Sequence, residues 1–205
     1  SFVNAVDACN SNIAIGSQAM ITVDRGTNGS ATVNGNIAIG YNALAGGDFV
    51  DQDKDLVGNI AIGKNALDHT AANAATGLVA VGHEALTALT SGNKNIAIGY
   101  EAGKAMTTGE GNVAIGYQAG DAMTATANTV LIGQSAGGSI NSTGANGTVA
   151  IGYQAFEDLT SGGSNTALGY RAGMNMTTGG NNVAIGYNSL VNAVDTCNSN
   201  IAIGS

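Results

Sequence analysis

Large aliphatic and small residues alternate in a short phrase that recurs along the chain. The phrase "NIAIGYNAL" at 36–44 returns as "NIAIGKNAL" at 59–67, "NIAIGYEAG" at 95–103 and "NVAIGYQAG" at 112–120. Ile, Val or Leu stands one position before each repeat glycine, and Ile or Val (Thr166 once) stands three before it. Alanine lies between them in ten of eleven copies, with Leu131 in the other. This alternation predicts a short β-strand before each glycine.

The spacing of the repeat glycines defines a unit of 17 residues. Successive spacings are 24, 23, 19, 17, 17, 17, 19, 17, 17 and 18, so insertions fall mostly near the start. A short period is the signature of a solenoid whose coils pack only on their neighbours. The sequence therefore predicts a single all-β array over 1–205, a parallel β-solenoid of about eleven ~17-residue coils and on the order of 50 Å long. The repeat glycines are Gly16, Gly40, Gly63, Gly82, Gly99, Gly116, Gly133, Gly152, Gly169, Gly186 and Gly204.

The residues after each glycine predict a return segment and a turn. Alanine stands three positions after the glycine, with Ser189 as the exception, and we expect a second short strand or a tight bend here. Phrases such as "TTGEGN" then predict a turn. Asparagine precedes the strand in eight copies, where its amide can bond the backbone or the asparagine of the next coil. Six coils carry a large apolar residue seven positions after the glycine: Leu89, Met106, Met123, Ile140, Leu159 and Met176.

The strand pattern gives each coil a large-residue face and an alanine face. We expect the large residues to fill a thin core, since one coil holds too few apolar side chains to fold alone. The alanine face lets another surface approach closely. That surface is either the opposite wall of the same coil or the same strip on two further chains, and the thin acidic solenoid favours the second. The alanine strip comprises Ala38, Ala61, Ala97, Ala114, Ala150 and Ala184.

Composition and charge exclude several classes of partner. Glycine makes up 32 of 205 residues, but the apolar residues are periodic, which argues for folded repeats and against disorder. The net charge is −8 and no Lys/Arg cluster exists, so we expect no nucleic-acid partner. No apolar run approaches the ~20 residues of a membrane helix. His69 and His83 form no zinc-spaced cluster, and no nucleophile elbow or phosphate loop is present, so we expect neither an enzyme nor a cofactor.

The first and last segments are near-identical copies. "SFVNAVDACNSNIAIGS" at 1–17 and "SLVNAVDTCNSNIAIGS" at 189–205 differ at two positions. This predicts a longer super-repeat, of which the chain is a fragment. Cys9 and Cys197 occupy the same place in the two copies, at opposite ends of the predicted rod, and therefore do not indicate a disulfide.

All six tyrosines directly follow a repeat glycine. Stacked coils would place them in one column, interrupted by Lys64, His83 and Gln134. Such a column is either a structural ladder or an aromatic strip that stacks on sugar rings, and its regular repetition favours the ladder. The tyrosines are Tyr41, Tyr100, Tyr117, Tyr153, Tyr170 and Tyr187.

Two insertions, 17–35 and 46–58, enlarge consecutive coils. Variable loops on a rigid scaffold commonly carry recognition, so we expect any receptor contact here. Asp51, Asp53 and Asp55 have the spacing of the first half of a calcium loop, but the later glycine and the closing glutamate are missing. A solvated loop is therefore favoured over a weak structural calcium site. The candidate receptor-contact residues are Asp24, Arg25, Asn28, Phe49, Asp51 and Lys54.

The phrase N-[IV]-A-I-G before a small-residue turn resembles the head repeats of YadA-like trimeric autotransporter adhesins. The longer form N-x-A-I-G-Y-x-A-L…T-x-G-x-N is similar to β-roll arrays in bacteriophage tail fibres. The resemblance covers nearly the whole chain and implies a left-handed parallel β-roll that forms a side-by-side homotrimer. It also implies an extracellular location, on a virion tail fibre or a bacterial surface. A 17-residue coil is longer than usual in such heads and implies a larger turn or a wider roll.

The expected function is structural and adhesive. A stiff fibre segment would present a surface to a host glycan or protein receptor. One alternative is a filament subunit that polymerises end to end, since uncapped solenoid ends template further strands. Another is a monomeric ligand- or ice-binding solenoid, which needs a flat threonine array, whereas the Thr-Thr and Thr-Ser pairs lie at turns and skip coils.

Overall fold

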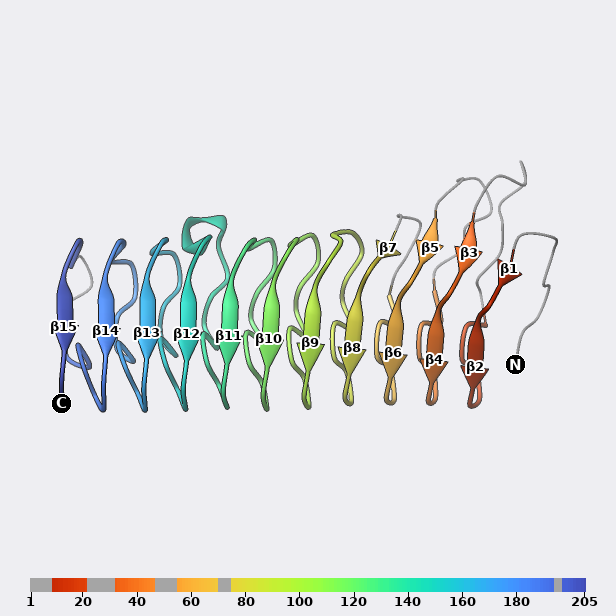
Figure 1. Ribbon diagram of the computed structural model, residues 1–205, viewed down its shortest axis with the longest axis horizontal. Coiled ribbons are helices and arrows are strands. Elements are labelled where there is room, and N and C mark those ends of the chain that lie inside the picture. Colours follow the sequence, from red (N-terminus) through yellow and green to blue (C-terminus); the bar gives the residue numbers. More distant parts are fainter. Residues whose placement is uncertain (1–8, 22–31, 47–54, 70–74, 194–196) are drawn as a thin grey trace.

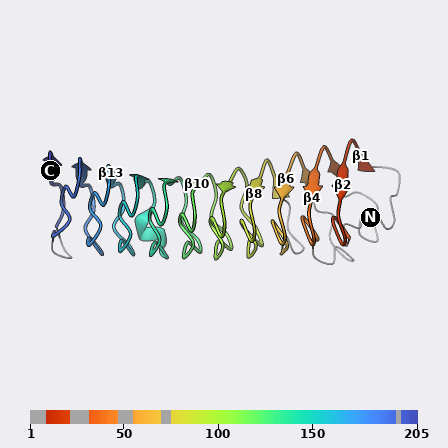
Figure 2. The ribbon, with the colours of Figure 1, turned by 90° about the horizontal axis from the view of Figure 1, so that it is seen from below.

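The computed structural model describes residues 9–21, 32–46, 55–69, 75–193 and 197–205. In these ranges the chain consists of short strands, bends and one turn of 3-10 helix, η1 (Thr143–Ala145). The coils stack in a single row, with the N- and C-terminal coils at opposite ends (Figure 1). The view from below shows the same row (Figure 2). The predicted all-β parallel solenoid is confirmed.

One parallel sheet of eleven strands runs along the rod. Each strand has three residues and ends directly before a repeat glycine, as the alternation predicted. Neighbouring strands pair in register, so equivalent residues of successive coils form straight columns; Ala114, for example, pairs with Ala97 and Leu131. The strands are β2 (Ile13–Ile15), β4 (Ile37–Ile39), β6 (Ile60–Ile62), β8 (Val79–Val81), β9 (Ile96–Ile98), β10 (Val113–Ile115), β11 (Val130–Ile132), β12 (Val149–Ile151), β13 (Thr166–Leu168), β14 (Val183–Ile185) and β15 (Ile201–Ile203).

A second, four-stranded parallel sheet lies at the N-terminal end of the rod (Figure 1). Its two-residue strands each come just before a main strand, in the part of the chain where the repeat spacing exceeds 17 residues. The residues after each glycine form a tight bend and no strand, which decides between the two predicted forms of that segment. The small sheet comprises β1 (Cys9–Asn10), β3 (Val33–Asn34), β5 (Leu56–Val57) and β7 (Ala75–Thr76).

The core lies between the main sheet and the bend, and the strand alanines point into it. Ala114 of β10, Ala119 of the bend and Met123 after it are all 0–1% exposed. The six apolar residues predicted seven positions after the glycine are all buried. The expectation that the large strand residues fill this core is wrong: Ile98 is 38% exposed and Leu168 is 47% exposed. A narrow coil has room for an alanine opposite the bend, so the aliphatic positions face outward.

Side-chain volume is balanced between neighbouring coils. Leu131 is the one large residue in the alanine column, and it is fully buried. A Cβ placed on Gly120 or Gly137 would lie 2.7 or 2.8 Å from its methyl groups. The two glycines therefore leave the space that Leu131 fills, which keeps the core close-packed.

A ladder of asparagine side chains closes the start of eight of the eleven main strands, while Leu78, Thr129 and Thr148 precede the other three. The amide of Asn36 donates to Oδ1 of Asn12 at 3.0 Å and to the carbonyl of Leu56 at 2.8 Å. Asn59 repeats the pattern on Asn36, at 3.1 Å. The predicted bonds to the backbone and to the neighbouring asparagine are thus both present. Because each amide satisfies buried groups of the adjoining coils, the ladder fixes the register of the stack.

Candidate functional site

The alanine strip lies inside the solenoid. Ala38, Ala61, Ala97, Ala114, Ala150 and Ala184 are each 0–1% exposed. The strip therefore faces the opposite wall of the same coil. No surface of another chain can reach these residues, so the favoured inter-chain placement is wrong.

The outer surface of the main sheet is instead an aliphatic face, which we define as the residues three and one positions before each repeat glycine. None of these side chains is buried in the eleven strands. Their in-register pairing arranges them in two parallel columns along the sheet. In mid-rod, Ile98 is 38% exposed and Leu168 is 47% exposed. A continuous apolar surface of this length is unusual on a soluble monomer.

Five of the six tyrosines, together with His83, form two stacked segments of the predicted column beside this face. His83, Tyr100 and Tyr117 stack with ring centroids 5.1 and 5.3 Å apart. Tyr153, Tyr170 and Tyr187 stack in the second segment, each 5.1 Å from the next. The ring planes of each stacked pair lie within 13° of parallel. Each stack therefore covers ring faces with neighbouring rings, which supports the ladder interpretation within the segments.

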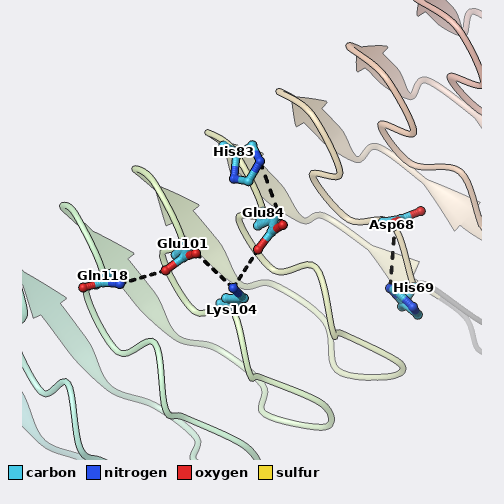
Figure 3. Close-up of polar contacts among 7 residues, drawn as sticks. All are labelled: Asp68, His69, His83, Glu84, Glu101, Lys104 and Gln118. Atoms are coloured by element: carbon cyan, nitrogen blue, oxygen red, sulfur yellow. Dashed lines mark hydrogen bonds and ion pairs between the residues drawn. The ribbon is translucent and has the colours of Figure 1, made fainter.

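An ion cluster lies next to the first aromatic segment (Figure 3). Lys104 Nζ lies 2.7 Å from Glu84 Oε2 and 2.9 Å from Glu101 Oε1. Gln118 Nε2 donates to the other oxygen of Glu101 at 2.7 Å, and His83 Nε2 lies 3.9 Å from Glu84. Glu84 and Glu101 occupy equivalent positions of adjacent coils, so Lys104 neutralises two carboxylates that stacking brings together.

The contacts of the cluster shift the pKa values of its members. The hydrogen bond from Lys104 lowers the pKa of Glu84 below its ordinary 4.5. The hydrogen bond from Gln118, followed by the one from Lys104, lowers the pKa of Glu101. The two carboxylates raise the pKa of Lys104, and the charge of Glu101 raises the pKa of Tyr100. All three ionised groups of the cluster therefore stay charged at neutral pH.

We expect Lys104→Met to lower the melting temperature at pH 7 and to have less effect as the pH falls. A lowered carboxyl pKa contributes stability above 4.5, its unfolded value, and that contribution is lost as the pH drops through the folded pKa. The loss at pH 7 should stay below about 1 kcal/mol because the side chains are partly exposed. Thermal unfolding at several pH values measures this loss.

Lys94→Met is the control, since Lys94 is 79% exposed and lies 3.7 Å from Glu110. An equal Lys104→Met effect at acidic and neutral pH would contradict this role.

The six residues expected to contact a receptor lie outside the described ranges. They are Asp24, Arg25, Asn28, Phe49, Asp51 and Lys54, and Asp53 lies outside these ranges as well. Asp55 is described, and its Oδ1 accepts a hydrogen bond from the Thr32 backbone N–H at 2.8 Å. The described part of the chain contains no group of three or more His, Cys, Asp or Glu side chains arranged to hold a metal ion. The weak calcium site thus stays a prediction.

The threonines at the far turn use their hydroxyl groups within the rod. Thr90, Thr107 and Thr124 lie in consecutive coils, and each donates to a backbone carbonyl of the next coil at 3.0–3.1 Å. Thr160 does the same at 2.9 Å. These hydroxyl protons are therefore engaged within the chain, which weakens the case for an ice-binding array.

Cys197 is a free, partly exposed thiol near the C-terminal end. Cys9 belongs to β1 at the other end of the row (Figure 1), so the two cysteines lie at opposite ends of the rod, as expected. Within the described ranges no helix is long and apolar enough to cross a membrane.

No protein-family model, curated protein or solved structure matches the chain. The functional assignment therefore depends on the aliphatic face, the aromatic column and the rod that carries them. The aliphatic columns are visible in the sequence, but their alternation with alanine does not show which of the two faces points outward.

Proposed function

We propose that this chain is a structural and adhesive segment of an extracellular fibre, in which three copies pack side by side along the aliphatic face. The proposal includes a left-handed coil, eleven coils per chain and no enzymatic activity. The fibre would belong to a phage tail or a bacterial surface and would attach it to a host glycan or protein. The observation that carries the proposal is the length of the aliphatic surface, whose side chains are all at least partly exposed, along the rod.

The geometry of the solenoid favours self-association over a flat partner of another kind. Three parallel copies would present the same columns at the same coil spacing, so the aliphatic residues could interdigitate coil by coil. Burying this surface would provide a hydrophobic gain of about 25 cal/mol per Å². In an assembly with closed rotational symmetry every copy makes the same contacts, so the assembly stops at a fixed number of copies.

We expect the double substitution Ile98→Arg and Ile115→Arg to convert the assembly to single chains. Both residues face outward, so the coil itself tolerates the change, whereas an interface would bury unpaired charges at a cost of several kcal/mol. Asn141→Arg with Thr143→Arg is the matched control, because it adds the same charge at exposed turn positions. Sedimentation velocity measures the size of both variants. An unchanged size in the Ile98/Ile115 variant would exclude the aliphatic face as the contact surface.

A further inference from the structure

The aromatic column is interrupted at Gln134, between its two stacked segments. Within a segment each ring covers the face of the next, so a sugar cannot stack there. Tyr117 ends the first segment and Tyr153 begins the second, and each therefore has one ring face that no other ring covers. We call the space over Gln134, between these two faces, the notch.

The notch is as wide as one missing ring of the aromatic column. Neighbouring rings along the column lie 5.1–5.3 Å apart. Tyr117 and Tyr153 are separated by two coil steps, or about 10 Å at the strand spacing. A ring inserted midway would lie about 5 Å from each tyrosine, which is a normal ring-to-ring stacking separation. Gln134 is shorter than a tyrosine, so the outer parts of both ring faces extend past its amide.

The notch is open to solvent, and the guanidinium of Arg171 lies 5.8 Å from the centroid of the Tyr153 ring. Tyr117 is 48% exposed, and Gln134 is exposed with no side-chain hydrogen bond among the described residues. On either side, Gln118 uses its amide nitrogen on Glu101, and Gln154 uses its amide oxygen on Arg171. Gln118 Oε1 and Gln154 Nε2 have no side-chain partner in the described part of the chain. Both bonds lead to coils on the far side from Gln134, so Gln134 itself is the amide that offers the notch a hydrogen-bond acceptor and a donor.

We infer that the notch binds one pyranose ring of a neutral glycan. A pyranose has two C–H-rich faces for the two tyrosines and a rim of hydroxyl groups for the amide of Gln134. Tyrosine suits such a site because its ring is apolar while its hydroxyl remains solvated. The unpaired amide of Gln134 favours a hydroxyl-bearing ring over a bare aromatic ring, which would leave it without a partner.

The inference deepens the proposed attachment function by naming its ligand class and site. It rests on that function for its biological meaning. The site itself is formed within one chain, since Tyr117, Gln134 and Tyr153 belong to three adjacent coils. Binding and assembly can therefore be tested separately.

The test is titration with neutral tetrasaccharides of glucose, galactose, mannose and N-acetylglucosamine, followed by NMR of the tyrosine rings. We expect at least one to shift the Tyr117 and Tyr153 resonances with a Kd of about 1 mM. Gln134→Tyr should fill the notch and weaken binding about tenfold or more, because it supplies the missing ring without disturbing the fold. Tyr41→Ala is the control for a change elsewhere in the column, because it removes a tyrosine that lies away from the notch and whose exposure, 47%, is similar to that of Tyr117.

Three results would overturn the inference: no tetrasaccharide shifts these rings, Gln134→Tyr binds as well as the native chain, or Tyr41→Ala loses as much affinity. Binding of phenol or indole in preference to every sugar would also overturn it. Light scattering on the same samples separates the two proposals. A monomer that binds sugar at the notch contradicts the trimer alone, and a trimer that binds none contradicts the notch alone.

Discussion

Gly116→Ala should destabilise the solenoid by at least about 3 kcal/mol. Gly116 has φ +137°, a conformation that side chains disfavour, and an added Cβ would lie 2.5 Å from the carbonyl oxygen of Gly133 in the next coil. Backbone hydrogen bonds prevent the coils from separating to admit this Cβ. Gly116 N–H donates to the carbonyl of Ile98 at 2.8 Å, and Gly133 N–H donates to the carbonyl of Ile115 at 2.7 Å. Urea denaturation measures the overall loss. Amide hydrogen exchange around Gly133 shows whether the loss of stability is confined to the neighbouring coils. This second measurement is needed because a solenoid can unfold in more than two states.

Gly58→Ala is the matched control for this substitution. Gly58 also has a positive φ, +66°, but an added Cβ would meet no atom within 4 Å. Only the conformational cost of about 1–2 kcal/mol should remain. Equal losses at the two positions would mean that backbone conformation, and not the close approach of successive coils, requires glycine after the strand.

Asn112→Ala should cost about 3–5 kcal/mol, because it leaves buried polar groups of two neighbouring coils without partners. The Asn112 amide donates to Oδ1 of Asn95 at 3.1 Å and to the carbonyl of Thr126 at 2.7 Å. Its oxygen accepts from the backbone N–H of Thr129 at 3.0 Å and from the hydroxyl of Thr129 at 2.8 Å. No water can replace these bonds without opening the coil, since Asn112 is 0% exposed. Chemical denaturation measures the loss.

Asn112→Thr provides the comparison, because threonine stands at the same place in the next coil, as Thr129. A hydroxyl keeps part of the hydrogen bonding, so we expect roughly half the loss of the alanine variant. If alanine and threonine proved equally stable, the asparagine column would be a packing feature and not a hydrogen-bonded ladder.

The sequence alone was sufficient to predict the strands, the in-register columns and the asparagine ladder. Each followed from a short period and from residue types that suit one local conformation. Alternation also showed that the two strand faces differ. It could not show which face points inward, because both alanine and isoleucine are compatible with a core, and the choice depends on the width of the coil.

A signal for the inward face was present in the sizes of neighbouring residues. Leu131 breaks the alanine column at the place where Gly120 and Gly137 stand in the adjoining bends, and such an exchange of volume indicates contact across a core. The tyrosine column was also predictable from its position after the glycine. The division of the column into two stacks, each with an uncovered ring face at its end, could not be predicted, because the spacing of the tyrosines does not determine how their rings are oriented.

The most direct test of the central claim is the mass of the native chain in solution, measured by light scattering over a range of concentrations. Side-by-side assembly on the aliphatic face predicts a constant mass of three times 20.1 kDa. A mass of 20.1 kDa at every concentration would show that the aliphatic face remains open to water and would contradict the trimeric fibre. A mass that grows steadily with concentration would contradict it as well and would support the end-to-end filament.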